Sequence, residues 1–183
     1  MLLSILICHL TNRKLLLERL MKCLQPQVDK VNENGAVVEV LIEEDQGQKT
    51  TGEKRNVLLD RATGQYTCYV DDDDTVSPQY CDLILKALEE KPDCVSLKGL
   101  LFRLGHTPRN FSHSIKHGIE WREEKFIYLR PPNHLNTVRR ELALQVKFPL
   151  IVIGEDKDYS TRLFPLLKTE TEVVPELYYY HTR

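Results

Sequence analysis

Apolar residues form strand-length runs that alternate with helix-like spacing in the first half of the chain. Residues 2–8 are apolar almost throughout, and residues 15–24 carry apolar side chains at helical spacing. Further apolar runs cover 37–42 and 66–70, and the segment 52–62 between them has the pattern of a helix. The pattern therefore predicts the order βαβαβ.

Glycine and proline mark the expected ends of these elements. Gly64 has no Cβ, so we expect it to end the helix over 52–62 in a left-handed conformation. Pro78 is expected in the first turn of a further helix with apolar positions over 83–88, and residues 94–102 are typical of another strand. Apolar strands that alternate with helices predict an α/β fold with an open, mainly parallel sheet and helices on both faces.

The second half of the chain is less regular. Residues 103–135 are rich in His, Pro and Asn with scattered aromatic residues, so we expect a hairpin or long loops that cover a site. An apolar stretch, 148–153, precedes acidic residues and a helix-like segment over 160–167. A last strand is expected over 177–180.

Length and charge exclude several classes of protein. With 183 residues, of which 42% are hydrophobic, the chain has the size of one globular domain, 1–183. The net charge is −2, with both signs interspersed, so no broad basic face for nucleic acid and no polybasic membrane patch is indicated. An anionic ligand would have to be held locally, by a metal or by a few cations.

The cysteines and the start of the chain bear on location. Five cysteines, an odd number without a CxxC pair, predict free thiols rather than a disulfide framework or a zinc knuckle. The first apolar run lacks a basic segment before it and is too short to cross a bilayer. We therefore expect no membrane span and a cytoplasmic location, which for a viral protein means the host-cell cytoplasm.

Clustered carboxylates follow two of the expected strands. Asp71, Asp72, Asp73 and Asp74 come directly after 66–70. The run 37–42 ends in Glu43, Glu44 and Asp45. Ligands of open α/β sheets bind beyond the carboxyl ends of the strands, and grouped carboxylates suit Mg²⁺ or Mn²⁺. The alternative is an acidic turn that caps the next helix, but a cap needs only one of four mutually repelling charges.

Two further segments could complete a site. Lys54, Arg55 and Asn56 lie near the start of a predicted helix, where free backbone N–H groups favour an anion. Glu155 and Asp156 precede another helix and could simply cap it. Combined with a metal and phosphate site, however, a separate carboxylate could take the proton from an attacking hydroxyl.

These blocks together resemble the family-2 glycosyltransferases of the GT-A fold, which move a sugar from a nucleotide diphosphate to an acceptor hydroxyl. The matching blocks span most of the chain and are Ser4–Arg13, Glu39–Asp45, Gly52–Asn56 with Ala62–Tyr66, Asp71–Asp74 with Pro78, and Gly154–Asp156. The pairing of the DxD pattern with the other blocks is more specific than DxD alone. The resemblance implies a Rossmann-like domain with a nucleotide-sugar half, 1–102, and an acceptor and catalytic half, 103–183.

The resemblance also implies roles for individual residues. Asp156 matches the catalytic base of inverting members, and Mn²⁺ or Mg²⁺ would be the cofactor. The nucleotide sugar, UDP- or GDP-linked, would be bound by Glu44 or Asp45, Arg55, Asn56, Asp71 and Asp72. The metal would be bound by Asp73, with Asp72 or Asp74 as alternates, and by His181 as a late histidine. The acceptor is unknown, and a homo-oligomer is left open.

The acceptor side is expected to draw on the irregular region. Asn133 and His134 follow a stiff Pro-Pro pair and, with Glu155, are candidates for a wall of the acceptor or donor-sugar pocket. Trp121, the only tryptophan, could stack on a sugar ring, although burial is the commoner fate of such a residue.

Departures from the family pattern leave the donor open. The turn over 9–13 and the strand end over 43–47 both differ from the usual family sequences. Two other functions would use similar residues. A nucleotidyltransferase would be expected to carry a Gly-rich phosphate loop after the first strand, and residues 9–13 contain no Gly. A catalytically silent module that binds a sugar or nucleotide is the remaining alternative.

Overall fold

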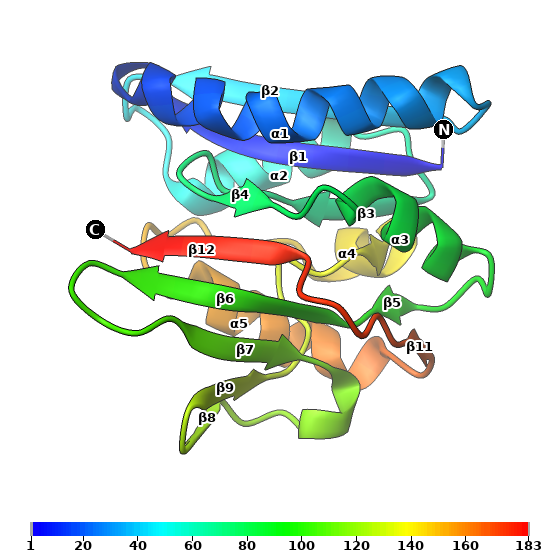
Figure 1. The fold of residues 1–183 in the computed structure, drawn as a ribbon, viewed down its shortest axis with the longest axis vertical. Coiled ribbons are helices and arrows are strands. Elements are labelled where there is room, and N and C mark those ends of the chain that lie inside the picture. The colour runs from blue at the N-terminus through cyan, green and yellow to red at the C-terminus, as the bar shows by residue number, and fades with distance from the viewer. Residues whose placement is uncertain (1, 183) are drawn as a thin grey trace.

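The computed structural model describes residues 2–182 and contains two mixed β-sheets with helices packed around them (Figure 1). The strands are β1 (Leu3–Leu10), β2 (Val38–Asp45), β3 (Tyr66–Tyr69), β4 (Thr75–Val76), β5 (Cys94–Val95), β6 (Leu97–Arg103), β7 (Arg109–His113), β8 (Arg122–Glu124), β9 (Ile127–Arg130), β10 (Val138–Arg139), β11 (Glu170–Thr171) and β12 (Tyr178–Thr182). The α-helices are α1 (Lys14–Glu33), α2 (Thr51–Arg61), α3 (Tyr80–Leu88), α4 (Arg140–Val146) and α5 (Glu155–Leu163). Short 3-10 turns cover Thr11–Arg13, Ile115–His117 and Phe164–Leu166.

The first sheet has the strand order β11-β5-β10-β3-β1-β2. β1 pairs in parallel with β2 on one side and with β3 on the other. Because these three strands run the same way, their carboxyl ends meet at one edge, and the acidic residues that follow β2 and β3 lie there. The predicted βαβαβ order and parallel core are confirmed.

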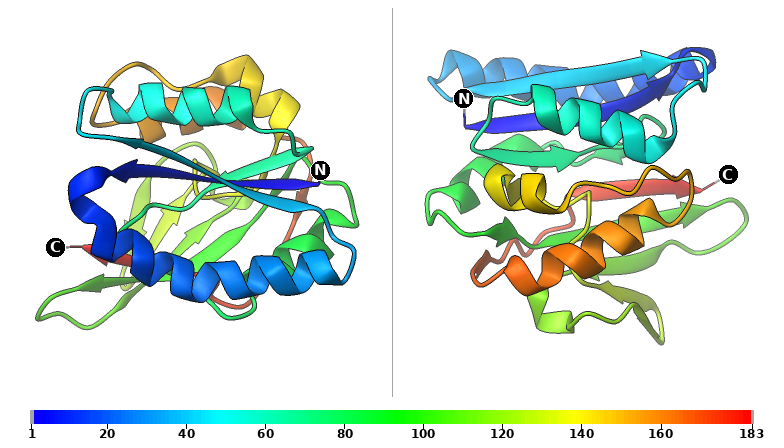
Figure 2. Two further views of the ribbon diagram at one scale, coloured as in Figure 1. Left: turned by 90° about the horizontal axis from the view of Figure 1, so that it is seen from above. Right: turned by 180° about the vertical axis from the view of Figure 1, so that it is seen from behind.

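Helices cover both faces of the first sheet, as predicted (Figure 2). Side chains alternate along a strand, so neighbouring residues of β1 pack on opposite faces. Ile5 and Ile7 belong to the apolar core that includes Leu20 and Leu24 of α1. Leu6 packs in the other core, with α2, α4 and α5. This double burial explains why β1 is apolar almost throughout.

A second sheet with the order β4-β12-β6-β7-β9-β8 was not predicted. The segment 103–135 is not only loops: β7 and β9 belong to this sheet, and β8 with β9 forms the expected hairpin. β12 joins parallel to β6 and antiparallel to β4, so it connects the acidic loop after β3 to the second sheet.

Several predicted boundaries were wrong. The helix predicted over 15–24 extends to Glu33 because apolar side chains continue at helical spacing and become buried. The strand predicted over 94–102 is split at Ser96 into β5 and β6, which belong to different sheets. α3 begins at Tyr80, so Pro78 precedes the helix instead of lying in its first turn.

Gly64 does not cap α2 in a left-handed conformation. The helix ends at Arg61 with Ala62 as its C-cap, and Gly64 has no positive φ. A Cβ on Gly64 would lie 2.7 Å from the backbone nitrogen and from Oγ of Ser4. The glycine is therefore required for close packing against β1, which the C-cap prediction did not consider.

The cysteines and the helices bear on two predictions made for the whole chain, free thiols and no membrane span. The five cysteines are all free. Among the helices of the described chain, none combines the length and the apolar character needed to cross a bilayer.

Candidate functional site

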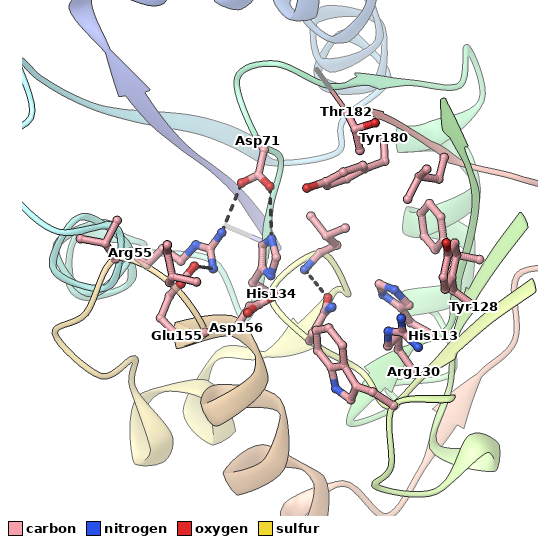
Figure 3. A pocket seen from close by; sticks show the side chains of 18 residues that line it. Arg55, Asp71, His113, Tyr128, Arg130, His134, Glu155, Asp156, Tyr180 and Thr182 are labelled. Atoms are coloured by element: carbon pink, nitrogen blue, oxygen red, sulfur yellow. Dashed lines mark hydrogen bonds and ion pairs between the residues drawn. The ribbon is translucent and has the colours of Figure 1, made fainter. Parts of the chain in front are cut away.

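A pocket of about 510 Å³ lies beside the end of β3, between residues of α2 and α5 on one side and residues of the second sheet on the other. Figure 3 shows two facing sides of this pocket. One side, here named the charged wall, consists of Arg55, Asp71, His134 and Glu155. The other, here named the aromatic wall, consists of Phe111, Trp121, Tyr128 and Arg130. Asp156 also lines the pocket, together with the apolar chain segment 152–153.

Arg55 organises the charged wall. Its Nη1 donates to Glu155 Oε1 at 2.8 Å, and its Nη2 donates to Asp71 Oδ1 at 3.3 Å. The guanidinium lies 5.3 Å from the ring centroid of Phe148 and is almost fully buried. Burial alone would lower the pKa of Arg55, but the charges of Asp71 and Glu155 contribute to a net rise. A buried cation bonded by two carboxylates holds α2, α5 and the end of β3 in a fixed arrangement.

Asp71 is bonded on both of its oxygens. Oδ2 lies 3.4 Å from Nε2 of His134, and the backbone N–H of Asp71 donates to the hydroxyl of Tyr178 at 3.0 Å. Burial would raise the pKa of Asp71, yet His134 and Arg55 together hold it well below its usual range. Asp71 is therefore an anionic hydrogen-bond acceptor at neutral pH. His134 keeps its Nδ1 buried without a partner in the described residues.

Asp156 lies in the first turn of α5, which starts earlier than the predicted segment 160–167. Gly154, the residue before the helix, has a φ of 86°, a left-handed conformation that glycine adopts without strain. Glu155 turns to Arg55, whereas the one hydrogen bond of the Asp156 side chain within residues 2–182 is from the N–H of Lys157 to Oδ1 at 2.8 Å. The two neighbouring carboxylates therefore have different environments. Glu155 is bonded to Arg55 in the charged wall, and the carboxylate of Asp156 faces the pocket.

Two predicted site residues support the backbone around the pocket. The side chain of Asn56 donates to the carbonyl of Phe148 at 2.9 Å and accepts its N–H at 2.8 Å, which fixes the chain that leads to α5. Asn133 lines the pocket, and its side chain accepts the N–H of Leu135 at 3.0 Å, which stabilises the turn that carries His134.

The other carboxylates of the acidic loop differ sharply in their surroundings. Asp72 is 2% exposed and is bonded by His9 Nδ1 at 2.8 Å and by Arg13 at 2.9 Å. Asp73 keeps 30% of its side chain exposed and also pairs with Arg13. Burial, opposed in part by Arg13, raises the pKa of Asp73. Asp72 thus fixes the loop, while Asp73 remains accessible at the edge.

Asp74 attaches the acidic loop to β12. It is 1% exposed, and it accepts the hydroxyl of Tyr178 and the backbone N–H of His181, both at 2.8 Å. Burial and the nearby charge of Asp71 raise the pKa of Asp74 to about 8. These contacts give Asp74 an observed structural role in joining the two sheets.

The predicted metal residues do not form a ready ligand set. His181 Nε2 lies 3.0 Å from the hydroxyl of Thr75. Within residues 2–182, no three His, Cys, Asp or Glu side chains converge as ligands. The charge of Asp73 does reach His181, where it opposes the lowering of the histidine pKa by burial and Arg19. One accessible carboxylate and a nearby imidazole are thus present on this edge.

The end of β2 contributes a buried ion pair outside the pocket lining. Lys54 Nζ donates to Asp45 Oδ1 at 2.8 Å and to the carbonyl of His9 at 3.1 Å. Burial would raise the pKa of Asp45, but Lys54 and the N–H of Lys49 lower it to about 2. Glu44 is exposed and lies apart from these contacts. Asp45 therefore has a fixed orientation beside the first turn of the chain.

The pocket lining contains six of the predicted residues: Arg55, Asp71, Asn133, His134, Glu155 and Asp156. Seven predicted residues lie outside the lining: Glu44, Asp45, Asn56, Asp72, Asp73, Asp74 and His181. Arg130 lies at the start of the segment 130–136 that was expected to form a pocket wall, but the sequence assigned it no role, and it did not indicate Tyr128 or Phe111, because isolated residues in an irregular region carry no motif. The lone Trp121 was the only signal for the aromatic wall, and it does line the pocket.

Comparisons with known proteins point to one family. The model of the family described as Glycosyl transferase family 2 matches residues 40–145, more than half of the chain. No curated protein matches the sequence.

Solved structures share the fold. Staphylococcus aureus TarS 1–349 in complex with UDP-GlcNAc is similar with a TM-score of 0.74 and 14% identity, over 100% of this chain and 59% of that one. The same protein in complex with UDP gives a TM-score of 0.67 and 15% identity, over 100% and 61% of the two chains. The chain spans about three fifths of TarS 1–349. At this identity, the similarity establishes the fold and leaves the ligands of this chain to be argued from its own residues.

Proposed function

Because the chain belongs to glycosyl transferase family 2, we propose that it transfers a sugar from a nucleotide-diphosphate donor to an acceptor hydroxyl. The observation that carries the proposal is the chain of contacts Asp71–Arg55–Glu155 beside Asp156 in one pocket. It joins the acidic strand end, where donors bind in such sheets, to a carboxylate free to act as a base. TarS, which shares the fold, was crystallised with UDP-GlcNAc and with UDP, which supports a UDP-linked donor.

The donor would occupy the charged wall and the adjoining sheet edge. The ionised Asp71 is suited to accept hydrogen bonds from hydroxyls of the ribose or of the donor sugar. Asp45, oriented by Lys54, would be the nearest fixed carboxylate at the end of β2 for the nucleoside. Arg55 would serve as a positioning residue, because its bonds to Asp71 and Glu155 set where both carboxylates lie.

The reaction we propose inverts the anomeric centre. The acceptor oxygen forms a bond to the anomeric carbon while the bond from that carbon to the diphosphate oxygen breaks. Asp156 takes the proton of the attacking hydroxyl, and the electron pair of the broken bond leaves with the nucleoside diphosphate. Asp156 suits this role because its neighbour Glu155, and not Asp156 itself, neutralises Arg55.

A divalent cation at this edge would have few protein ligands, because within residues 2–182 no three His, Cys, Asp or Glu side chains converge. Asp73 is accessible and its carboxylate lies within electrostatic reach of His181, whose imidazole nitrogen is a suitable ligand for Mn²⁺. Asp72 and Asp74 are buried among other partners, whereas Asp73, which pairs with Arg13, keeps 30% of its side chain exposed, so Asp73 and His181 would hold the ion. When bound, the cation would neutralise charge on the departing diphosphate.

Calorimetric titration with UDP, GDP, dTDP and CDP, each with and without Mn²⁺, tests the proposal. We expect one nucleotide to bind in a metal-dependent way and Asp73→Ala to weaken that binding. Asp82→Ala is the matched control, because Asp82 is an exposed carboxylate of α3 that pairs with Lys30 away from the pocket. Absence of binding to every nucleotide would contradict the proposal, and binding without donor turnover would favour a silent module.

A further inference from the structure

Arg130 is a pocket arginine without a carboxylate partner. The other pocket arginine, Arg55, is bonded by Asp71 and Glu155, whereas no ion pair within residues 2–182 includes Arg130. Its Nη1 donates to the carbonyls of Arg122 at 2.6 Å and Leu129 at 3.0 Å. These bonds fix the guanidinium and leave its Nη2 and Nε available.

Aromatic rings hold Arg130 in place. The guanidinium lies 4.8 Å from the ring centroid of Trp121 and 5.2 Å from that of Tyr128. Figure 3 shows Arg130 next to Tyr128 and across the pocket from Asp71 and Arg55. A planar cation stacked on rings is preorganised to bind a carboxylate or phosphate through two parallel hydrogen bonds.

Trp121 provides a second, independent sign of a missing ligand. Its Nε1 is buried and has no hydrogen-bond partner in the described chain, although the residue lines the pocket. A buried donor without an acceptor costs free energy, and a ligand oxygen would satisfy it. Sugar hydroxyls offer such oxygens, and the indole ring offers an apolar face for the ring of a sugar.

We infer that the aromatic wall is the acceptor subsite and that it takes a sugar bearing an anionic group, either a carboxylate or a phosphate. The inference rests on the proposed transferase function, because it assigns the opposite wall to the donor. Arg130 binds the anionic group, and Trp121 binds a hydroxyl through its N–H. The acceptor hydroxyl then lies between the aromatic wall and Asp156, which lines the same pocket.

Fluorescence measures this subsite directly, because Trp121 is the only tryptophan of the chain. The probes are methyl β-glucuronide and glucose 6-phosphate as anionic sugars, methyl β-glucoside as the neutral match, and inorganic phosphate as the free anion. We expect the fluorescence of Trp121 to change saturably with the anionic sugars. The neutral sugar should bind at least about tenfold more weakly, because it lacks the group that forms a charge-assisted hydrogen bond with Arg130. The two anionic sugars tell a carboxylate site from a phosphate site.

Arg130→Gln should remove the preference for the anionic sugars. Arg109→Gln is the matched control, because Arg109 stacks on the same Tyr128 at 4.3 Å but pairs with Glu123 and does not line the pocket. It should keep the preference. Equal binding of the anionic and neutral sugars by the wild-type protein would overturn the inference, and so would an equal response to inorganic phosphate and glucose 6-phosphate.

The inference and the proposed function fail in different measurements. Nucleotide affinity by calorimetry should be unchanged in Arg130→Gln, because Arg130 lies on the acceptor side. If the wild-type protein bound no nucleotide, the proposed function would be wrong. The fluorescence titrations with anionic and neutral sugars would still test whether Arg130 binds an anion. If Arg130 acted only as a counter-charge for Asp156, Arg130→Gln would slow turnover of anionic and neutral acceptors equally, and the inference would be wrong.

Discussion

The charged wall and the aromatic wall face each other across one pocket but hold their cations differently. In the charged wall, Arg55 is almost fully buried and bonded by two carboxylates. In the aromatic wall, Arg130 is bonded by backbone carbonyls and stacked on rings. The first arrangement has its charges paired within the protein, whereas the second leaves a charge for a ligand.

This difference follows from where each wall comes from. The charged wall combines the end of β3 with α2 and α5, which pack on the first sheet and its apolar cores, and with His134 from the segment between β9 and β10. The aromatic wall lies on β7, β9 and the segment before β8, near the free edge of the second sheet. Phe111 and Tyr128 tie the aromatic wall to the apolar core, whereas Trp121 and Arg130 lie outside that core, so these two residues can vary between proteins at less cost to the fold.

The largest expected effect is a loss of turnover on substitution of Asp156, which belongs to neither wall. Asp156→Asn should lower the turnover of sugar transfer, or of donor hydrolysis without an acceptor, about a thousandfold because the general base is lost. Nucleotide affinity by calorimetry should stay near wild type. Asp158→Asn, a change in the same helical turn at a carboxylate paired with Arg162, serves as the control. Near wild-type turnover in Asp156→Asn would exclude it as the base.

The next effect contrasts the two arginines. Arg55→Ala should lower the free energy of unfolding by about 3 kcal/mol, because Glu155 is left buried without its partner. Arg130→Gln should change it by less than about 1 kcal/mol, since no buried carboxylate depends on Arg130. Urea denaturation measures both.

A double variant checks the physical reason. Adding Glu155→Gln to Arg55→Ala should recover part of the lost stability, because a buried amide costs less than a buried unpaired carboxylate. Equal destabilisation by Arg55→Ala and Arg130→Gln would remove the distinction between the walls.

The smallest expected effect is a pH dependence of the free energy of unfolding that arises from His113, a pocket residue on the side of the aromatic wall. Burial, with the nearby charges of His134 and Arg130, lowers the pKa of His113 to about 3. The unfolded chain binds a proton near pH 6.5 and the folded chain does not, so stability falls as the pH drops from about 6.5 to about 3. Between pH 7 and 5.5 this costs about 1 kcal/mol.

His113→Gln should remove that contribution, measured as the difference in unfolding free energy between the two pH values. His106→Gln, at an exposed position of the β6–β7 loop, should leave it unchanged. An identical pH dependence in wild type and His113→Gln would contradict the assignment.

The first sheet could be predicted because its signals are local. The apolar runs of β1, β2 and β3 are long enough to identify strands, and parallel pairing then brings Asp45 and the acidic loop to one edge. Arg55, Asp71 and Asp156 were found through sequence blocks that resemble a family. Their lining of one pocket agrees with that grouping, although their roles remain predictions.

The second sheet could not be predicted because its strands are short, partly polar and paired over long sequence distances. β12 pairs with β6 nearly 80 positions earlier, and β9 is only four residues long. The contacts of Arg130 with Trp121 and Tyr128 exist only after this pairing, so no periodicity or motif marks them in the sequence. The opposed environments of Asp73 and Asp74, adjacent in sequence, likewise depend on β12.

The position of β12 has a consequence for synthesis on the ribosome. β12 lies between β4 and β6, and its Tyr178 hydroxyl bonds both Asp71 and Asp74. His9 and Arg13, which bond Asp72, are synthesised before the acidic loop, but the contacts of Asp71 and Asp74 with β12 form only after residues 178–182 have left the exit tunnel. The contacts that join the acidic loop to the second sheet are thus among the last of the described chain to form, and a nascent chain stalled before residue 178 would lack them at Asp71 and Asp74.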